Sequence, residues 1–238
     1  MTTAWRMLLD AGELVAGADD ALLQSLAQHL GAAEQARLPG FVRARRRREF
    51  ILGRLLLRHC VARLTSCPMD QVALTERAGT GPQIVVPAAW GAPVQASLAH
   101  SGGWIACAFG VGFALGVDIE TGGAERDLAA LAQTAFSPAE CRWLDAQGDL
   151  ATGFYQLWCG KESLYKYRNN AGLPTAAGLP PLQCDDLHAA PSAAGAALML
   201  DSSMPGVHLA TCCPINTALI TEKIPVEDLL KRFTVGNK

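Results

Sequence analysis

The stretch VQASLAHSGGWIACAFGVGFALGVDIE, residues 94–120, decides the fold class. It holds three short apolar runs, at 94–100, 103–110 and 113–120, and the links between them are brief and contain glycine. Short apolar runs bounded by turn residues are typical of β-strands, and links of this size favour hairpins. We therefore predict an antiparallel meander of three strands in the middle of the chain.

A long helix is predicted before this meander, from Arg45 to Leu64. In the run RRRREFILGRLLLRHCVARL, Phe50, Leu57 and Val61 fall on one apolar stripe, while arginines recur on another face. The helix is therefore expected to be a core element with a basic side. A first strand is expected at 5–10.

Helical patterns return after the meander. The expected elements are helices at 126–135, 138–147, 151–167 and 226–233 and a hairpin within 196–213. The second of these helices has the clearest start, because Ser137 is a good N-cap, Pro138 suits the first helical position and Glu140 completes a capping box.

The order of these elements indicates an α+β protein with two halves. Residues 1–112 are expected to form the N-terminal half and residues 113–238 the C-terminal half. Each would be a small domain, and a chain of this size can bury a workable core in either arrangement.

Composition excludes several classes of protein. The net charge of −2 and the pI near 6.2 argue against a surface devoted to nucleic acid, although RARRRR at 43–48 is a local basic patch. The eight cysteines form no CxxC pair, so a zinc or disulfide scaffold is not expected. No apolar run approaches the roughly 20 residues that span a bilayer, and the beginning MTTAWRMLLDAGE is unlike a signal peptide. We expect a cytoplasmic protein without a membrane partner.

Two carboxylates end the third predicted strand. Asp118 and Glu120 are two positions apart and therefore share a face, whereas Val117 and Ile119 would point into the core. Adjacent carboxylates repel each other unless a cation lies between them, and magnesium commonly takes one or two carboxylates together with phosphates. The alternative is a solvated strand end with no ligand.

A second group of charges lies on the helix predicted at 151–167. Glu162 and Lys166 are four residues apart on one face, and Lys161 is offset by one position. They could form an ordinary exposed ion pair. However, Trp158 and Leu164 indicate a substantially buried helix, where such charges need ionic partners. Glu162 is therefore a candidate metal ligand or general base, and the lysines are candidate phosphate ligands.

His100 lies at the turn of LAHSGGW, where an imidazole and backbone amides could meet a phosphate. A structural histidine is the alternative. One or two arginines of the run 43–48 could also reach a phosphate, and the others are expected to be solvated.

Together these motifs resemble the Sfp-type 4′-phosphopantetheinyl transferases. The resemblance rests on the segments RRRREFILGRLLLR (45–58), LAHSGGW (98–104), GVDIE (116–120), AFSPAE (135–140) and FYQLWCGKESLYK (154–166). It implies a pseudodimer of two similar α+β halves, each a small antiparallel sheet packed with helices, with the active site at their junction. A monomer would then be sufficient.

The resemblance also implies an activity and its residues. The phosphopantetheine arm of coenzyme A would pass to a serine of an apo acyl or peptidyl carrier protein, with magnesium, and adenosine 3′,5′-bisphosphate would leave. Asp118, Glu120 and Glu162 would hold the magnesium, Glu162 would accept the serine proton and Lys166 would balance charge on the bridging or leaving oxygen. The residues implied at the nucleotide end of coenzyme A are Arg45, His100, Lys161 and Arg37.

Two positions depart from the family pattern. Ala99 replaces a serine before His100, and Gly81 stands where a lysine is expected near the adenine. Other magnesium-dependent pyrophosphate chemistry, such as nucleotide hydrolysis, is the alternative enzyme, and a nucleic-acid-binding module is the alternative from another class.

Overall fold

The computed structural model describes residues 2–17, 20–75, 81–91, 93–122, 126–174, 178–182 and 195–234. The chain divides into two compact units, each containing one long helix. The α7 unit comprises Phe113–Ala218 with Met1–Thr2, and the α4 unit comprises Thr3–Gly112 with Leu219–Lys238. Their long helices are α4 (Ala44–Thr65) and α7 (Leu150–Asn170). The predicted α+β class, with small antiparallel sheets packed with helices, is confirmed, and the location of the active site at a junction stays a prediction.

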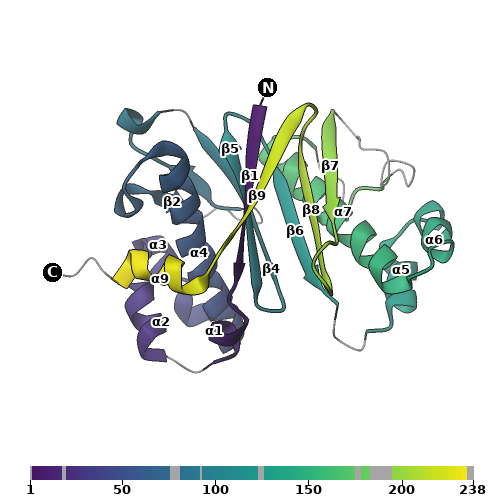
Figure 1. Ribbon diagram of the computed structural model, residues 1–238, viewed down its shortest axis with the longest axis horizontal. Coiled ribbons are helices and arrows are strands. Elements are labelled where there is room, and N and C mark those ends of the chain that lie inside the picture. Colours follow the sequence, from purple (N-terminus) through teal and green to yellow (C-terminus); the bar gives the residue numbers. More distant parts are fainter. Residues whose placement is uncertain are drawn as a thin grey trace. The chain divides into compact units, whose positions relative to one another are not determined.

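The α4 unit is built on a sheet with strand order β4-β5-β1-β9 (Figure 1). Its strands are β1 (Thr2–Asp10), β4 (Val94–Ser101), β5 (Trp104–Val111) and β9 (Thr217–Ile224). β5 pairs antiparallel with β4 on one side and with β1 on the other. Its residues are buried from Ile105 to Gly110, and α4 packs against this strand.

Helix α4 is buried along its whole middle, from Ile51 to Val61. Two arginines of its expected basic side lie inside this stretch rather than in solvent. Both pair with Glu34: Arg58 Nη1 lies 3.1 Å from Oε1, and Arg54 Nε lies 3.5 Å from the same oxygen. A buried charge needs such a partner, and the short helix α3 (Ala32–Gln35) supplies it.

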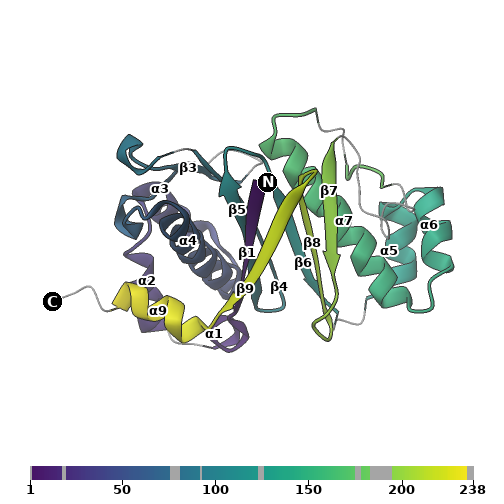
Figure 2. The ribbon, with the colours of Figure 1, turned by 45° about the horizontal axis from the view of Figure 1, so that its top comes forward.

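Smaller elements complete the α4 unit (Figure 2). They are α1 (Gly12–Ala16), α2 (Asp20–Ala27), the 3₁₀ turns η1 (Leu38–Gly40), η2 (Met69–Gln71) and η3 (Ala88–Trp90), the hairpin β2 (Ala73–Thr75) with β3 (Gln83–Val85), and α9 (Val226–Thr234). Leu229 and Phe233 of α9 belong to the core of this unit. The expected C-terminal half, 113–238, thus differs from the structure, because the chain from Leu219 onward joins the α4 unit.

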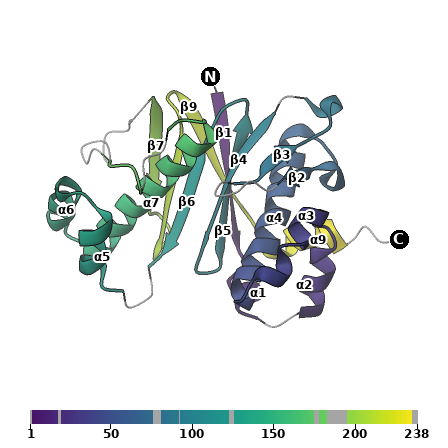
Figure 3. The same ribbon diagram turned by 180° about the vertical axis from the view of Figure 1, so that it is seen from behind.

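The α7 unit contains a sheet with strand order β6-β8-β7, and α7 lies along one face of it (Figure 3). The strands are β6 (Gly116–Thr121), β7 (Ala196–Asp201) and β8 (Val207–Pro214), and both pairings are antiparallel. The other helices are α5 (Leu128–Ala135) and α6 (Pro138–Asp145). The core of this unit includes Phe136 and, from α7 itself, Phe154, Leu157 and Leu164.

The predicted three-strand meander is wrong in its third member. β4 and β5 form the expected hairpin, but β6 pairs with β8 in the other sheet. The second edge of β5 is already occupied by β1, so no edge remains for β6. Gly112 turns the chain away with a φ of 77°, a value that favours glycine.

Most of the remaining elements follow their local signals, but β9 has no counterpart among the predicted elements. The capping box of α6 is present, with Ser137 Oγ accepting from the Glu140 amide and the Glu140 carboxylate accepting from the Ser137 amide. In the part of the chain that the structure describes, no helix combines the length and apolar character that a membrane span requires.

Candidate active site

The acidic strand β6 and helix α7 approach each other closely at Gly116. A Cβ at this position would lie 2.0 Å from the carbonyl oxygen of Ser163 and 2.6 Å from the amide nitrogen of Tyr167. Alternate residues of a strand share a face, so Asp118 and Glu120 lie on the face that Gly116 presents to α7. The predicted pairing of these two carboxylates on one face is therefore consistent with the strand register.

Asp118 is bonded to Lys166 across this contact. Lys166 Nζ lies 2.7 Å from Asp118 Oδ1 and 3.1 Å from the carbonyl oxygen of Val117. The second carboxylate oxygen, Oδ2, is buried and has no hydrogen-bond partner among the described residues. A buried carboxylate oxygen without a donor is costly, which marks this atom as a position for a ligand.

Asp118 also experiences an excess of negative charge. Burial raises the pKa of Asp118 to about 6, the ammonium of Lys166 opposes that rise, and the charges of Glu120 and Glu162 add to it. Both glutamates are thus close enough to act on Asp118 through their fields. This excess of negative charge around Asp118 favours the arrival of a cation.

The acidic cluster fits a magnesium ion in the chemistry of its donors. They are carboxylate oxygens, which hard divalent cations prefer, and the orphaned Oδ2 is one open position. However, nowhere in the described chain do three or more His, Cys, Asp or Glu side chains gather into a metal-holding group. The side chains of the predicted ligands Asp118, Glu120 and Glu162 are therefore not assembled around a common point.

The thiol of Cys159 lies beside the same cluster, a feature that the sequence did not reveal. Burial raises its pKa well above the usual value, and the charges of Asp118 and Glu120 raise it further. Its Sγ lies 3.5 Å from the carbonyl oxygen of His208, to which it donates. The Cys159 thiol is therefore a neutral, buried group that links α7 to β8 beside the cluster.

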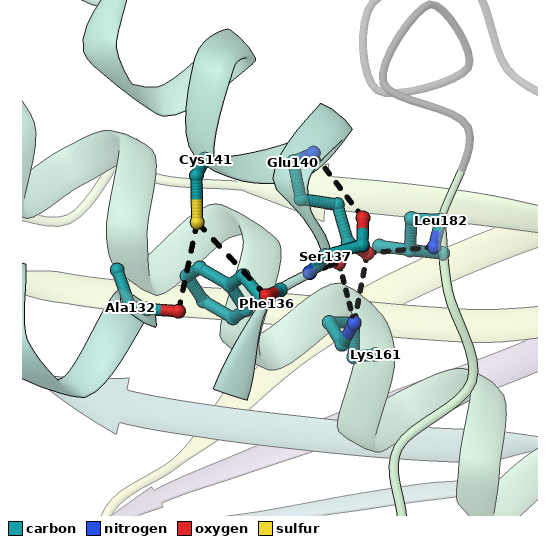
Figure 4. A network of polar contacts seen from close by, with 7 residues as sticks. All are labelled: Ala132, Phe136, Ser137, Glu140, Cys141, Lys161 and Leu182. Atoms are coloured by element: carbon teal, nitrogen blue, oxygen red, sulfur yellow. Dashed lines mark hydrogen bonds and ion pairs between the residues drawn. The ribbon is translucent and has the colours of Figure 1, made fainter. Parts of the chain in front are cut away.

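Lys161 lies elsewhere than expected, inside the α7 unit. Its Nζ is 2.8 Å from both carboxylate oxygens of Glu140, and its side chain is only 3% exposed (Figure 4). The ammonium is therefore engaged by a protein carboxylate, and this position differs from the expected contact with coenzyme A. The structure gives Lys161 the role of joining α7 to α6.

Glu140 is the centre of this network. Its carboxylate also accepts hydrogen bonds from the amides of Ser137 at 2.7 Å and Leu182 at 2.8 Å (Figure 4). Burial alone would raise the pKa of Glu140, but the bonds from Leu182, Lys161 and Ser137 outweigh it and lower the pKa. The carboxylate is therefore held ionised, as the partner of a buried ammonium must be.

The α4 unit contains a basic pocket of about 290 Å³. It is lined by Arg37, Arg46, Glu49, Phe50 and His100, among others. Two of the predicted nucleotide-binding residues, Arg37 and His100, thus meet in one cavity. Arg45, the third in this unit, does not line it: its side chain is 56% exposed and its Nε bonds to Glu49 Oε1 at 3.0 Å.

Arg46 occupies the position expected for Arg45. Its Nη1 lies 3.0 Å from His100 Nδ1 and 3.3 Å from Glu49 Oε2. Arg46, Phe50 and Gly53 recur at helical spacing among the residues lining the pocket. This i, i+4, i+7 periodicity is the signal that could have distinguished Arg46 from Arg45.

Phe50 provides an aromatic wall for two guanidinium groups. The Cζ atoms of Arg37 and Arg54 lie 4.9 and 4.8 Å from its ring centroid. Stacking of this kind orients a guanidinium while its N–H groups continue to donate. The pocket therefore presents fixed cationic donors beside apolar surface.

Gly81 lines the same pocket, together with Pro82. A Cβ at Gly81 would meet no atom of the described residues within 4 Å. Among the described residues that line the pocket, the arginines come from α4 and from Arg37, and the turn at 81–82 adds none.

Comparisons with known protein families agree with this geometry. Residues 114–203 match the model of the 4′-phosphopantetheinyl transferase superfamily, and residues 18–110 match the model of the N-terminal part of 4′-phosphopantetheinyl transferases. A comparison with curated proteins gave no match. The two matched segments cover most of the chain and contain both the acidic cluster and the basic pocket, so the protein belongs to the 4′-phosphopantetheinyl transferase superfamily.

Proposed function

We propose that the protein transfers the 4′-phosphopantetheine arm of coenzyme A to a serine hydroxyl of an apo acyl or peptidyl carrier protein, with magnesium, and releases adenosine 3′,5′-bisphosphate. Family membership supports the coarser statement, which is phosphopantetheine transfer from coenzyme A to a carrier protein. The finer statement is carried by one observation: the orphaned, buried Oδ2 of Asp118 lies among carboxylates on a segment that matches the transferase superfamily.

The acidic cluster supports the chemistry of phosphoryl transfer. Asp118, Glu120 and Glu162 would hold magnesium, which when bound neutralises charge on a pyrophosphate. Glu162 accepts the proton of the serine hydroxyl as its oxygen bonds to phosphorus. The bond from that phosphorus to the bridging oxygen breaks, and the electron pair leaves with the nucleotide. Lys166, placed beside Asp118 at 2.7 Å, balances charge on the departing oxygen.

The basic pocket supports binding of the nucleotide end of coenzyme A. Arg37, Arg46 and His100 line it and can donate to phosphate oxygens. Arg46 replaces Arg45 in this assignment, because Arg45 does not line the pocket. Lys161 is assigned to the buried pair with Glu140 instead of coenzyme A.

Intact-mass spectrometry of an apo carrier protein tests the proposal. Incubation with the protein, coenzyme A and magnesium should add one phosphopantetheine to the carrier, and a chelator should prevent the addition. The Glu162→Gln variant is the matched control, since it removes a charge at nearly constant volume. No mass gain on acyl or peptidyl carriers from a folded sample would overturn the proposal, and nucleotide release without a carrier would point to a hydrolase.

A further inference from the structure

Glu49 is a buried carboxylate at the edge of the basic pocket, and its side chain is only 2% exposed. Three cationic or ionisable groups converge on it. Arg45 Nε lies 3.0 Å from Oε1, while Arg46 Nη1 and His100 Nδ1 lie 3.3 and 3.2 Å from Oε2. The two arginines come from the preceding turn of α4, and His100 comes from β4, 51 residues farther along the chain than Glu49.

This carboxylate is outnumbered by positive charge. Arg45 and Arg46 are permanently cationic, and each side chain is 56% exposed, so one end of the cluster remains accessible to an anion. Burial of a single carboxylate is tolerable when several donors surround it. The surplus charge lies on the side where Arg46 and His100 line the pocket.

The arrangement at His100 Nδ1 allows two hydrogen-bonding states. Arg46 Nη1 lies 3.0 Å from this nitrogen, and a guanidinium can only donate, so that contact requires Nδ1 without a hydrogen. Glu49 Oε2 lies 3.2 Å away and can only accept, so that contact requires Nδ1–H. The two contacts exclude each other, and the choice fixes the tautomer of the ring.

An anion in the pocket decides between these states. A phosphate oxygen accepts from Arg46, which removes the competing donor from Nδ1, and it favours a ring that carries hydrogen on both nitrogens. Nδ1–H then donates to Glu49, and the protonated ring adds a positive charge to the pocket that it lines. A carboxylate behind a histidine performs the same orienting task in many protein sites.

We propose that Glu49 is a positioning residue that holds His100 as a doubly protonated donor, and Arg46 in place, when a phosphate group occupies the basic pocket. The inference rests on the proposed function, because it takes that phosphate to belong to the nucleotide end of coenzyme A. Glu49 itself bonds to no reacting atom in this scheme and acts through its two neighbours.

The test uses adenosine 3′,5′-bisphosphate as the probe and the imidazole ¹⁵N signals of His100 as the readout. In the wild-type protein, saturation with the probe should bring both ring nitrogens to the protonated shift range. In Glu49→Gln, the bound ring should stay neutral and the probe should bind about 10- to 100-fold more weakly, as expected when a charge-assisted hydrogen bond is lost. With a carrier protein, KM for coenzyme A should rise similarly while kcat changes less than about threefold.

Glu222→Gln is the matched control, because Glu222 also pairs with an arginine of α4, Arg63, but does not line the basic pocket. It should leave the probe affinity and the His100 signals unchanged. If Glu49→Gln does not fold, the wild-type spectrum alone decides. A bound ring whose Nδ1 lacks hydrogen would overturn the proposal.

The outcomes separate this inference from the proposed function. If the probe binds Glu49→Gln as tightly as it binds the wild-type protein, the positioning role of Glu49 is refuted. The proposed transfer reaction is unaffected by that result. Failure of the wild-type protein to modify any carrier, combined with the expected ¹⁵N shifts, would refute the transfer reaction and support Glu49 as the residue that orders an anion pocket.

Discussion

Lys166 on α7 is bonded to only one oxygen of the Asp118 carboxylate on β6, and the other oxygen is buried without a donor among the described residues. The pair is therefore asymmetric. A pair serving stability alone would be expected to satisfy both oxygens, as the Lys161 ammonium does for Glu140. The asymmetry supports the proposal that Asp118 takes a further ligand.

The first prediction concerns Asp118 and pH. Burial raises the pKa of Asp118 from 3.8 to about 6, so its contribution to stability is present below the unfolded pKa and is lost as pH rises through about 6. Asp118→Asn cannot ionise. Without metal, its unfolding free energy relative to wild type should therefore grow between about pH 4 and pH 7, by roughly 2–3 kcal/mol. Urea unfolding across this range measures it, and parallel pH curves would contradict it.

Magnesium should stabilise wild type more than Asp118→Asn, the opposite of the order expected without metal. A ligand that binds only the folded state raises stability, so magnesium with coenzyme A should raise the Tm of wild type and leave Asp118→Asn nearly unchanged. Equal shifts in the two proteins would argue that Asp118 is not a ligand.

Glu162→Gln should lose the chemical step. Removal of a general base commonly costs about 10²- to 10⁴-fold in rate, so kcat should fall by at least about 10²-fold, while the Tm should stay close to that of wild type. The loss is measured in a single-turnover reaction with a carrier protein, in which mass spectrometry records the modified carrier over time. Normal turnover would show that another group accepts the serine proton.

The Glu140–Lys161 pair should behave as one unit in unfolding experiments. Because each partner is buried, Glu140→Gln and Lys161→Met should each destabilise the protein by about 3–5 kcal/mol, by leaving an unpaired charge or unfilled acceptors. The double variant should lose much less than the sum. Additive losses would show that the two side chains stabilise the fold independently.

The close approach of β6 and α7 should not tolerate a side chain at Gly116. The added Cβ would meet backbone atoms of Ser163 and Tyr167, which cannot move without shifting the helix. Gly116→Ala should therefore cost at least about 3 kcal/mol and greatly reduce activity. Gly148→Ala is the matched control in the same unit, because a Cβ there meets no atom within 4 Å. Similar unfolding free energies for the two variants would show that α7 can yield to a side chain at Gly116.

Much of the fold could be predicted because its signals are local. The cap at Ser137 and the apolar pattern of α4 depend on neighbours in sequence, and both elements occur where expected. Strand pairing is not local, and the assignment of β6 to the meander failed because β1 occupies the edge of β5. β9 was not predicted at all, because TALITEKI alternates only weakly between apolar and polar residues.

The candidate site was predictable in its residue types but not in its contacts. The motif at 161–166 cannot show whether Lys161 or Lys166 points inward. That depends on Glu140, which lies 21 residues before Lys161 and pairs with it. Arg46 could have been preferred to Arg45 from its helical spacing to Phe50 and Gly53, but its contact with His100 depends on the packing of α4 against β4. Glu49 carried no signal beyond its spacing from these arginines.

The interrupted course of the α4 unit has a consequence for biosynthesis. Its sheet contains β1 from residues 2–10 and β9 from residues 217–224, and its core includes Leu229 and Phe233. A ribosome therefore delivers the whole α7 unit before the last strand and helix of the α4 unit emerge. Domains usually fold in the order of their synthesis, but here the strand made early must wait for a partner made much later. Until β9 has been made, one edge of β1 lacks its partner strand, and an unpaired strand edge is a template for wrong pairing.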